Sequence, residues 1–342
     1  MIKVYLLAYL NRNFGDDLFL KILLERYPNI IFYSMSNYEY SQYQNLRLTE
    51  YKKVRIVNKL IKIFTCNKFS YENILNNKCN YLIMLGGSMF IEGKSKHLFS
   101  MFKNKKFYII GSNFGPYYSL SFKNKYADLF SKACDVCFRD DYSYDLFKNN
   151  SKVRKASDII FSLDIDKYLS NEKIVSISVV NPDIKLDKSY TKKYIRFINS
   201  IIKVFLEKKY RINLISFCKA EGDEDIINRL VSINDNTHIS KICYNGDIDE
   251  ILFALGKSEY VVGSRFHANI IGLKMNKKII PIAYSDKTIN ALKDLGYNGK
   301  IYDIRALDTF DSNLHVYNEF QLDDSLCPLE HFKIIDNDLK EE

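Results

Sequence analysis

No apolar run in the sequence approaches the roughly 20 residues that a membrane-spanning helix needs. Residues 1–10 are largely apolar but form only a short run and lack a small-residue cleavage site, so we expect a buried strand there rather than an export signal. The seven cysteines, an odd number scattered along 342 residues, do not indicate a disulfide framework. We therefore expect free thiols in a reducing, cytoplasmic setting.

Nucleotide-binding fingerprints are also missing. The sequence contains no Gly-x-Gly-x-x-Gly and no complete Gly-x-x-x-x-Gly-Lys-Ser/Thr loop. Lys and Arg exceed Asp and Glu by 50 to 41, and this balance of +9 suits an anionic ligand, a nucleic acid or an acidic membrane surface. The lysines are spread over the whole chain without a nucleic-acid-binding motif, so we expect no nucleic-acid partner. Loose, peripheral contact with the anionic inner membrane face is compatible with the charge.

The composition, with 47% hydrophobic and 27% charged residues, is ordinary for a protein that folds along its whole length. Amphipathic stretches alternate with short apolar runs, which is typical of parallel sheets covered by helices on both faces. The fold class is therefore α/β. The expected buried strands are residues 2–9, 81–85, 107–110, 135–138, 174–180, 212–217, 260–262 and 278–283.

The length exceeds what one hydrophobic core usually serves, and the polar stretch 164–172 separates two blocks of similar size. We predict an N-terminal α/β domain over residues 1–165 and a C-terminal one over 173–306. Residues 307–342 are a C-terminal extension of unknown role. Two doubly wound, Rossmann-like domains facing each other would gather their strand ends around one cleft. The sequence carries no signal for an oligomeric state.

Glycine-containing turns fall at four expected strand ends: residues 13–17, 85–88, 111–116 and 262–267. Such turns let the backbone approach a ligand closely and start helices whose N–H groups can hold an anion. Any one of them alone fits an ordinary strand-to-helix turn equally well. Their joint occurrence favours a ligand site.

The segment 260–275 is the most informative. A strand runs into a turn where Ser264 can cap the following helix, and Arg265 and His267 then fall in the first helical turn, where the dipole disfavours positive charge. No Asp or Glu occurs over residues 263–283, so that stretch would not repel an anion. Lys287, after the next strand, adds a third cation. We favour a cationic cluster here over a hydrogen-bonded core histidine.

In the first half, residues 134–143 end a strand with Arg139 and continue with acidic residues suited to a helix start. Arg139 is either a surface ion-pair partner or projects toward the same anion. Cys134 and Cys137 have the spacing of half a zinc site, but no second such pair exists, and we expect no metal. The remaining histidines, which have no clustered partners and are interpreted as structural or exposed, are His97, His238, His315 and His331.

Several short elements follow one another in a characteristic order. They are Asn13-x-Gly15-Asp16, Gly86-Gly87, Gly111-x-Asn113-x-Gly115-Pro116, Arg139-Asp140-x-x-Ser143, Ser157-Asp158, Gly263-Ser264-Arg265-x-His267 and Pro281-x-x-Tyr284-x-x-Lys287. Over roughly residues 1–300 this set resembles the polysaccharide pyruvyl transferase family. The Gly-x-Arg-x-His element and the downstream Lys are the specific part of the resemblance.

The resemblance implies a GT-B-like pair of α/β domains. It also implies transfer of the pyruvyl group of phosphoenolpyruvate onto two hydroxyls of a sugar, which forms a cyclic ketal and releases phosphate. The acceptor would belong to a bacterial cell-surface polysaccharide, such as a capsule or exopolysaccharide, or to its precursor, free or lipid-linked. Phosphoenolpyruvate would serve as co-substrate, and no further cofactor is expected. Neither the sugar nor the hydroxyls that react can be identified from the chain.

Holding a phosphate and a carboxylate requires several fixed cations, for which we assign Arg139, Arg265 and Lys287. His267 is assigned as the general acid that protonates the methylene carbon. The predicted donor-binding residues are Gly263, Ser264, Arg265, Tyr284 and Lys287, with the C-terminal domain on the donor side.

The N-terminal domain is the predicted acceptor side. Asp16 either binds or deprotonates an acceptor hydroxyl, or it caps a helix. Asn113 and Asp158 are assigned to the cleft only through the resemblance. The predicted acceptor-binding residues are Gly15, Asp16, Gly87 and Asn113, with Tyr117, Tyr118 and Tyr142 as candidate stacking platforms.

Two other functions stay open at this point, because a fold does not fix a function. One is a sugar-nucleotide glycosyltransferase on the same scaffold; the absence of acidic residues over 263–283 counts against it, since a nucleotide ribose commonly recruits one. The other is a glycan-binding scaffold without turnover.

Overall fold

The chain divides into two compact units in a computed structural model that describes residues 2–65, 70–93, 99–103, 105–307, 310 and 326–340. The first unit contains residues 2–11, 16–162 and 326–340, and the second contains residues 12–15 and 163–307. The end of the predicted extension, residues 326–340, therefore packs with the first unit. The assignment of an acceptor side and a donor side stays a prediction.

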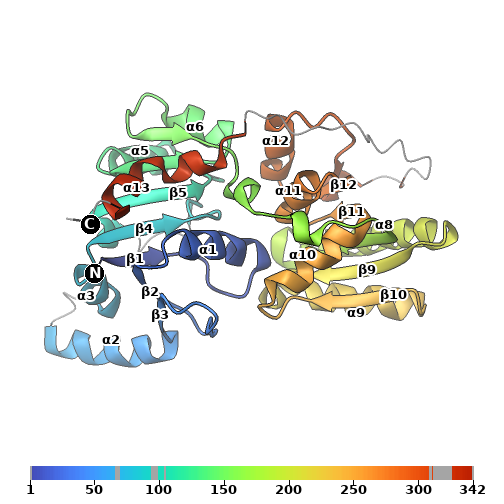
Figure 1. The fold of residues 1–342 in the computed structure, drawn as a ribbon, viewed down its shortest axis with the longest axis horizontal. Coiled ribbons are helices and arrows are strands. Elements are labelled where there is room, and N and C mark those ends of the chain that lie inside the picture. The colour runs from blue at the N-terminus through green and yellow to red at the C-terminus, as the bar shows by residue number, and fades with distance from the viewer. Residues whose placement is uncertain are drawn as a thin grey trace. The chain divides into compact units, whose positions relative to one another are not determined.

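The first unit is built on seven parallel strands in the order β3-β2-β1-β4-β5-β6-β7 (Figure 1). The strands are β1 (Lys3–Leu7), β2 (Ile31–Met35), β3 (Leu46–Thr49), β4 (Tyr81–Leu85), β5 (Lys106–Ser112), β6 (Asp135–Phe138) and β7 (Val153–Lys155). The helices are α1 (Phe14–Arg26), α2 (Tyr51–Thr65), α3 (Tyr71–Asn77), α4 (Phe99–Phe102), α5 (Leu120–Phe130), α6 (Asp141–Phe147) and α13 (Lys333–Lys340), with short 3-10 turns at Ile159–Ser162 and Pro328–Phe332.

The second unit repeats this plan with six parallel strands in the order β10-β9-β8-β11-β12-β13. The strands are β8 (Glu172–Ser178), β9 (Arg211–Ser216), β10 (Ile239–Cys243), β11 (Ser258–Gly263), β12 (Lys278–Ala283) and β13 (Tyr302–Asp303). The helices are α7 (Pro182–Lys185), α8 (Lys188–Glu207), α9 (Asp223–Asn234), α10 (Ile248–Lys257), α11 (Phe266–Lys274) and α12 (Asp286–Asp294), with 3-10 turns at Asp166–Tyr168, Lys219–Glu221 and Ile304–Ala306.

Helices cover both faces of the second sheet. Val175 and Ile177 of β8 pack in one core cluster with buried residues of α8 and α9. Between them in the sequence, Ser176 donates a hydrogen bond to the carbonyl oxygen of Ala254 in α10, 3.1 Å away. Because successive side chains of a strand point to opposite faces, α10 lies on the other side of the sheet from α8 and α9. The arrangement is doubly wound.

The first sheet is covered in the same way. Phe107 and Ile109 of β5 belong to a cluster with Tyr126 and Phe130 of α5. Tyr108, which points to the opposite face, donates to Asp338 of α13. The predicted class, two doubly wound Rossmann-like α/β domains, is thus confirmed.

All eight strands expected from apolar runs are present, as β1, β4, β5, β6, β8, β9, β11 and β12. The strands that the sequence analysis missed, β2, β3, β7, β10 and β13, lie toward the sheet edges. Their residues are buried less uniformly, as in the half-exposed pattern of Ile239–Cys243, so they lack the continuous apolar signal of a central strand.

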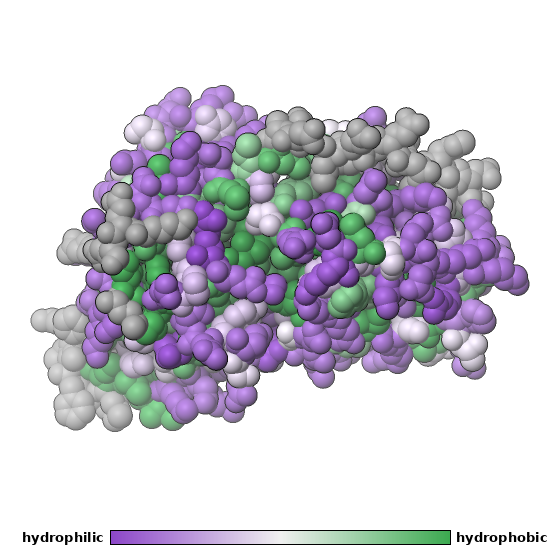
Figure 2. Space-filling view, in the orientation of Figure 1, coloured by the Kyte–Doolittle hydropathy of each residue, from purple (hydrophilic) through white to green (hydrophobic). Residues whose placement is uncertain are grey.

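Hydrophilic side chains cover most of the visible face of the second unit (Figure 2). This agrees with the outer faces of its amphipathic helices being polar. In the part of the chain that the structure describes, no helix is both long enough and apolar enough to cross a membrane.

The C-terminal segment is tied to the first unit by polar contacts (Figure 1, red). Asp336 accepts hydrogen bonds from Arg26 and, at 2.6 Å, from the hydroxyl of Tyr27. The ring of His331 is fully buried and donates from Nε2 to the carbonyl oxygen of Ser157, 2.8 Å away. Burial lowers the pKa of His331 to about 3, with a smaller contribution from the charge of Arg154.

We expect His331 to make the protein acid-sensitive. A histidine titrates near pH 6.5 in the unfolded chain, so between pH 6.5 and 3 the unfolded state binds the extra proton and stability falls as the pH falls. The loss from this group amounts to about 2 kcal/mol between pH 7 and pH 5. The variant His331→Gln should lack this component when urea unfolding is compared at the two pH values. Parallel pH dependence in the two proteins would contradict the expectation.

Candidate functional site

The strand order reverses between β1 and β4 in the first unit and between β8 and β11 in the second. In open α/β sheets, ligands bind beyond the carboxyl ends of the strands at such reversal points. Most of the residues predicted from the sequence follow the carboxyl ends of β1, β4, β5, β6, β11 and β12, at or beside these reversal points. They form one cluster in each unit.

The cluster of the first unit centres on Arg139, directly after β6. Its side chain is buried, and Nη1 lies 2.8 Å from a carboxylate oxygen of Asp158. Nη2 donates to the side-chain oxygen of Asn113, 3.3 Å away. Arg139 also lies over the ring of Phe19, 5.3 Å from its centroid. The interpretation of Arg139 as a surface ion-pair partner is therefore wrong, because the pair is buried.

Local packing fixes Asn113 at the end of β5. The next residue, Phe114, is buried among aromatic rings, with that of Phe147 4.8 Å away, and its N–H donates to the hydroxyl of Ser143 over 2.7 Å. Asp140 in turn accepts from the N–H of Ser143 and so caps α6, as the acidic run after the strand predicted. The turn after β5, which carries Asn113, and the turn after β6, which carries Arg139, are therefore joined by hydrogen bonds.

Asp16 and Gly87 lie together in the same unit. A Cβ on Gly87, whose φ is +67°, would lie 3.2 Å from Oδ1 of Asp16. The N–H of Gly15 donates to the side chain of Asn13, 3.1 Å away, so Asn13 supplies a cap at the start of α1. Asp16 sits inside the first turn and is half-buried.

The cluster of the second unit begins with the turn from β11 into α11. Gly263 is packed so closely by Asn269 that a Cβ there would overlap the Asn269 side chain. The expected cap by Ser264 is wrong: Ser264 is fully buried and accepts from the hydroxyl of Tyr194, 2.8 Å away. Arg265 occupies the N-cap position without a side-chain cap, and His267 lies in the first turn.

Arg265 is the buried centre of this cluster. Its Nε donates to Asp223 over 3.0 Å, Nη2 donates to the other oxygen of Asp223, and Nη1 donates to Glu221. Lys185 also pairs with Glu221, at 2.7 Å. Two cations and two carboxylates therefore balance in a largely buried network.

Burial and pairing act in opposite directions on this network. Burial lowers the pKa of the Arg265 guanidinium, but the charges of Asp223 and Glu221 outweigh it and raise that pKa above its ordinary value. Burial raises the pKa of Asp223, and Arg265 offsets part of this rise. For Glu221, Arg265 and Lys185 overcome burial and lower the pKa. Arg265 therefore stays charged.

Tyr284 and Lys287 follow the carboxyl end of β12, which lies at the same edge of the sheet as the carboxyl end of β11. The ammonium group of Lys185 lies 5.9 Å from the centre of the Tyr284 ring, and that of Lys287 lies 5.0 Å from the centre of the Phe266 ring. Phe266 and His267 stack edge to face with centroids 5.0 Å apart. The structure therefore brings the predicted donor residues into one neighbourhood.

Gly15 belongs to this second cluster. The segment 12–15 is anchored where the rings of Phe14 and Phe217 meet at 4.6 Å and where Phe14 N–H donates to the Phe217 carbonyl oxygen over 3.0 Å. A methyl group on Gly15 would overlap Nδ1 of His267. Only glycine leaves room for the imidazole. Asp16, the next residue in the chain, belongs to the other unit.

Three residues of this network, Lys185, Glu221 and Asp223, were not predicted from the sequence. The acidic run that begins at Asp223 is typical of a helix start, and only tertiary contact gives it a second role. A usable signal did exist, because residues 218–223 follow the expected strand 212–217 and the carboxyl ends of parallel strands share one edge.

Over the described residues, no group of three His, Cys, Asp or Glu side chains gathers as a metal ion would require. Cys137 is buried and Cys134 half-buried, and both are free thiols. His238 is exposed and His331 buried, whereas His97 and His315 lie outside the described residues.

Comparison with known proteins gives a family and a fold. The family described as polysaccharide pyruvyl transferase matches residues 13–286. The chain is 22% identical over 256 residues to the amylovoran biosynthesis protein AmsJ of Erwinia amylovora, covering 66% of this chain and 62% of the relative. The chain thus spans less than two thirds of the length of that relative.

Among solved structures, the UDP-GlcNAc 2-epimerase of Methanocaldococcus jannaschii in complex with UDP-GlcNAc and UDP is similar, with a TM-score of 0.61, 10% identity and full coverage of both chains. The Anabaena protein Alr3699/HepE in complex with UDP-glucose has a TM-score of 0.52 and 10% identity, over 89% of this chain and 86% of that one. At such identities the likeness concerns the fold, which is of the GT-B type.

We expect Asp223→Asn to destabilise the second unit by about 3 kcal/mol, because it leaves buried positive charge without its partner. Asp225→Asn is the matched control, since Asp225 lies in the same first turn of α9 but is exposed; it should cost less than about 0.5 kcal/mol. Urea unfolding followed by circular dichroism measures both. Equal losses would show that the helix start, not the ion pair, matters.

Proposed function

The chain belongs to the polysaccharide pyruvyl transferase family, and on that footing we propose that it transfers the pyruvyl group of phosphoenolpyruvate onto two hydroxyls of a sugar. The product is a cyclic ketal on a cell-surface polysaccharide or its precursor, and phosphate is released. No further cofactor takes part. The observation that best supports this proposal is the cluster around His267, Arg265 and Lys287 at the start of α11.

In this proposal the donor anion binds at the N-terminus of α11, which favours negative charge. The network of Lys185, Arg265, Glu221 and Asp223 is balanced in charge, so it adds no net positive charge of its own. In this proposal Lys287 and the imidazolium of His267 pair with the phosphate and the carboxylate of the donor. Arg265 uses at least three of its five N–H groups on carboxylates and acts chiefly by holding the turn that carries His267.

His267 acts as the general acid. Its imidazolium gives a proton to the methylene carbon of phosphoenolpyruvate, which becomes a methyl group, and positive charge develops on the adjacent carbon. One sugar hydroxyl bonds to that carbon, the second replaces the phosphate, and the carbon–oxygen bond to phosphate breaks. Of the two hydroxyl protons, one restores the charge on His267 and the other leaves with phosphate. A positioned acid of this kind typically contributes 10²–10⁴-fold.

The acceptor is proposed to bind through the first unit. Asp16, half-buried beside Gly87, is suited to accept hydrogen bonds from sugar hydroxyls or to take a proton from one of them. Asn113 is engaged by Arg139, which orients its amide.

Exposed aromatic rings follow two turns of the first unit: Tyr118 comes after the Asn113 turn, and Tyr142, in α6, comes after the Arg139 turn. The side chain of Tyr118 is 86% exposed and that of Tyr142 is 48% exposed, so neither ring is buried in the hydrophobic core. A Cβ on Gly115 would lie 3.8 Å from Tyr117 and 4.0 Å from Tyr142, so these two rings flank the glycine. We propose these three tyrosines as a platform on which the apolar face of a sugar stacks.

We also propose that the protein works in the cytoplasm, because the described cysteines are all free thiols. A lipid-linked acceptor would be met at the inner membrane face, where the net charge of +9 favours loose contact.

The function itself is tested by incubating the protein with phosphoenolpyruvate and a panel of sugars, with phosphate release and product mass as readouts. His267→Gln should lower phosphate release by at least about 100-fold while donor affinity, measured by calorimetry, changes much less. Gly15→Ala, whose methyl group would displace the imidazole, should also lower turnover. Unchanged turnover in His267→Gln would remove the histidine from the reaction.

Two other outcomes would replace the proposal. Release of a nucleotide from sugar nucleotides, with no phosphate from phosphoenolpyruvate, would make the protein a glycosyltransferase. Binding of glycans without affinity for phosphoenolpyruvate would make it a non-catalytic scaffold.

The aromatic platform has a separate readout. Tyr118→Ala should raise the KM for the sugar acceptor by about tenfold with little change in kcat, since a stacking contact of this kind is worth roughly 1 kcal/mol or somewhat more. The control is Tyr51→Ala. Tyr51 is 37% exposed and opens α2 after the edge strand β3, which β2, β1 and β4 separate from β5 in the sheet. If both variants behave alike, the platform is not an acceptor site.

A further inference from the structure

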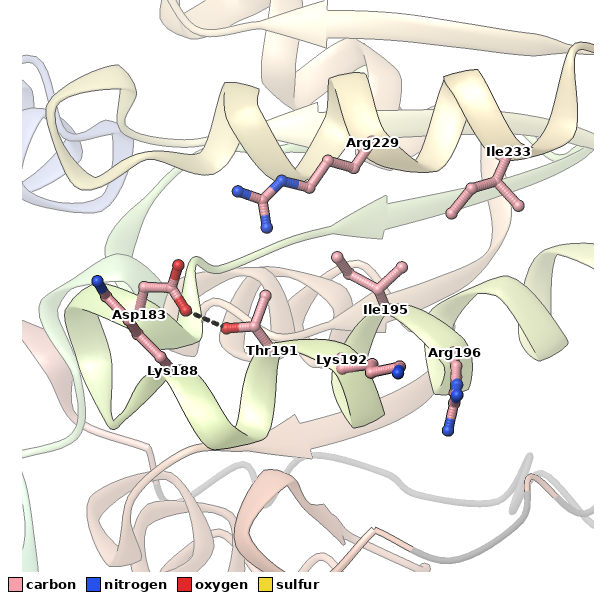
Figure 3. Close-up of a pocket in the computed structure, with 8 residues that line it drawn as sticks. All are labelled: Asp183, Lys188, Thr191, Lys192, Ile195, Arg196, Arg229 and Ile233. Carbon is pink, nitrogen blue, oxygen red and sulfur yellow. Dashed lines mark hydrogen bonds between the residues drawn. The ribbon is translucent and has the colours of Figure 1, made fainter.

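An open groove of about 490 Å³ runs between α8 and α9 in the second unit (Figure 3). Thr191 and Ile195 point from α8 toward α9, and Arg229 and Ile233 project from α9 on the facing side. The groove is separate from the cluster around His267, none of whose residues lines it.

The groove is strongly basic. Lys188, Lys192 and Arg196 line it from α8, Arg229 lines it from α9, and all four are exposed. Across the described parts of the chain, none of these four side chains forms an ion pair. Among the described residues that line the groove, the one carboxylate is that of Asp183, which accepts a hydrogen bond from the hydroxyl of Thr191 (Figure 3, dashed line).

The three cations of α8 form a row. They recur every four residues, so they lie on one side of the helix and extend over about 12 Å of its length. Like charges in such a row repel each other, and a bound anion that extends along the groove relieves the repulsion. A single small anion would contact only part of the row.

The near end of the groove adjoins the candidate site. Asp183 and Lys185 both belong to α7, which follows the carboxyl end of β8, and Lys185 pairs with Glu221 of the Arg265 network. Lys188 opens α8 three residues later. From there α8 runs back toward the amino ends of the strands, and the row of cations leads away from the site with it.

We propose that this groove binds a carboxylated glycan chain. The inference rests on the proposed function, because a pyruvyl ketal leaves the carboxylate of the donor on the sugar and makes the product an anionic polymer. Guanidinium and ammonium groups pair well with carboxylates. A chain lies lengthwise between two helices, whereas a flat bilayer would rest on the helix ridges without reaching Thr191 and Ile195 on the floor.

This binding would keep a modified chain on the protein while further sugar units are modified. The expected sign is an affinity that rises with the number of carboxylates on the polymer and falls with salt, because exposed ion pairs are screened.

The test uses polygalacturonate and its fully methyl-esterified, neutral form as probes, with affinity measured by calorimetry at low salt. The groove variant is Lys192→Glu with Arg196→Glu. Its control is Lys193→Glu with Lys203→Glu, which makes the same charge change at exposed positions of the same helix outside the groove. Wild type should prefer the charged polymer; the groove variant should lose about tenfold in affinity and the control little.

An equal loss in both variants, or no preference for the charged polymer, would overturn the proposal. Binding to vesicles of phosphatidylglycerol is measured in parallel. If the groove variant loses affinity for these vesicles but not for the charged polymer, the groove is a membrane contact and the proposal is overturned. Circular dichroism checks that each variant is folded. Phosphate release with a small sugar acceptor is measured on the same preparations. Its absence in wild type would refute the proposed function. The preference for the charged polymer is judged from the binding measurements alone.

Discussion

The buried pairing of Arg265 with Asp223 and Glu221 is the constraint on which the second unit depends. It links the turn after β11 to the segment between β9 and α9. That segment lies about 40 residues earlier in the sequence. Charges this deeply buried are tolerated only when they are paired and hydrogen-bonded. The network therefore fixes the start of α11, and with it the direction in which His267 points.

The first unit also has a buried ion pair that holds a turn at a strand end, but aromatic packing contributes more there. Arg139 and Asp158 form its buried ion pair, and a set of packed aromatic rings around Phe114 holds the neighbouring turn. In both units, an arginine that the sequence suggested as a ligand for substrate is already held by a carboxylate of its own unit. Each arginine therefore holds the turn that carries it, and under the proposed function the donor meets the start of α11 with His267 and Lys287.

Much of the fold could be predicted from the sequence because central parallel strands are continuous apolar runs. The edge strands, such as Ile239–Cys243, are half-exposed and carry no such signal. In the site, the turn Gly263–His267 was found because glycine and misplaced cations are visible locally, whereas Asp223 looks like any acidic helix start. The role of Ser264 was misjudged for the same reason, since only the tertiary fold supplies Tyr194 as its partner.

The return of residues 326–340 to the first unit has a consequence for how the protein is made. Apart from residues 12–15, the second unit is encoded between residue 162 and residue 326 of the first. During synthesis, therefore, the face of the first sheet that α13 covers stays open until the second unit has been translated. The second unit is complete in sequence earlier and can fold while the first still awaits its last helix. A ribosome that stalls before residue 326 would leave a finished second unit beside an unfinished first one.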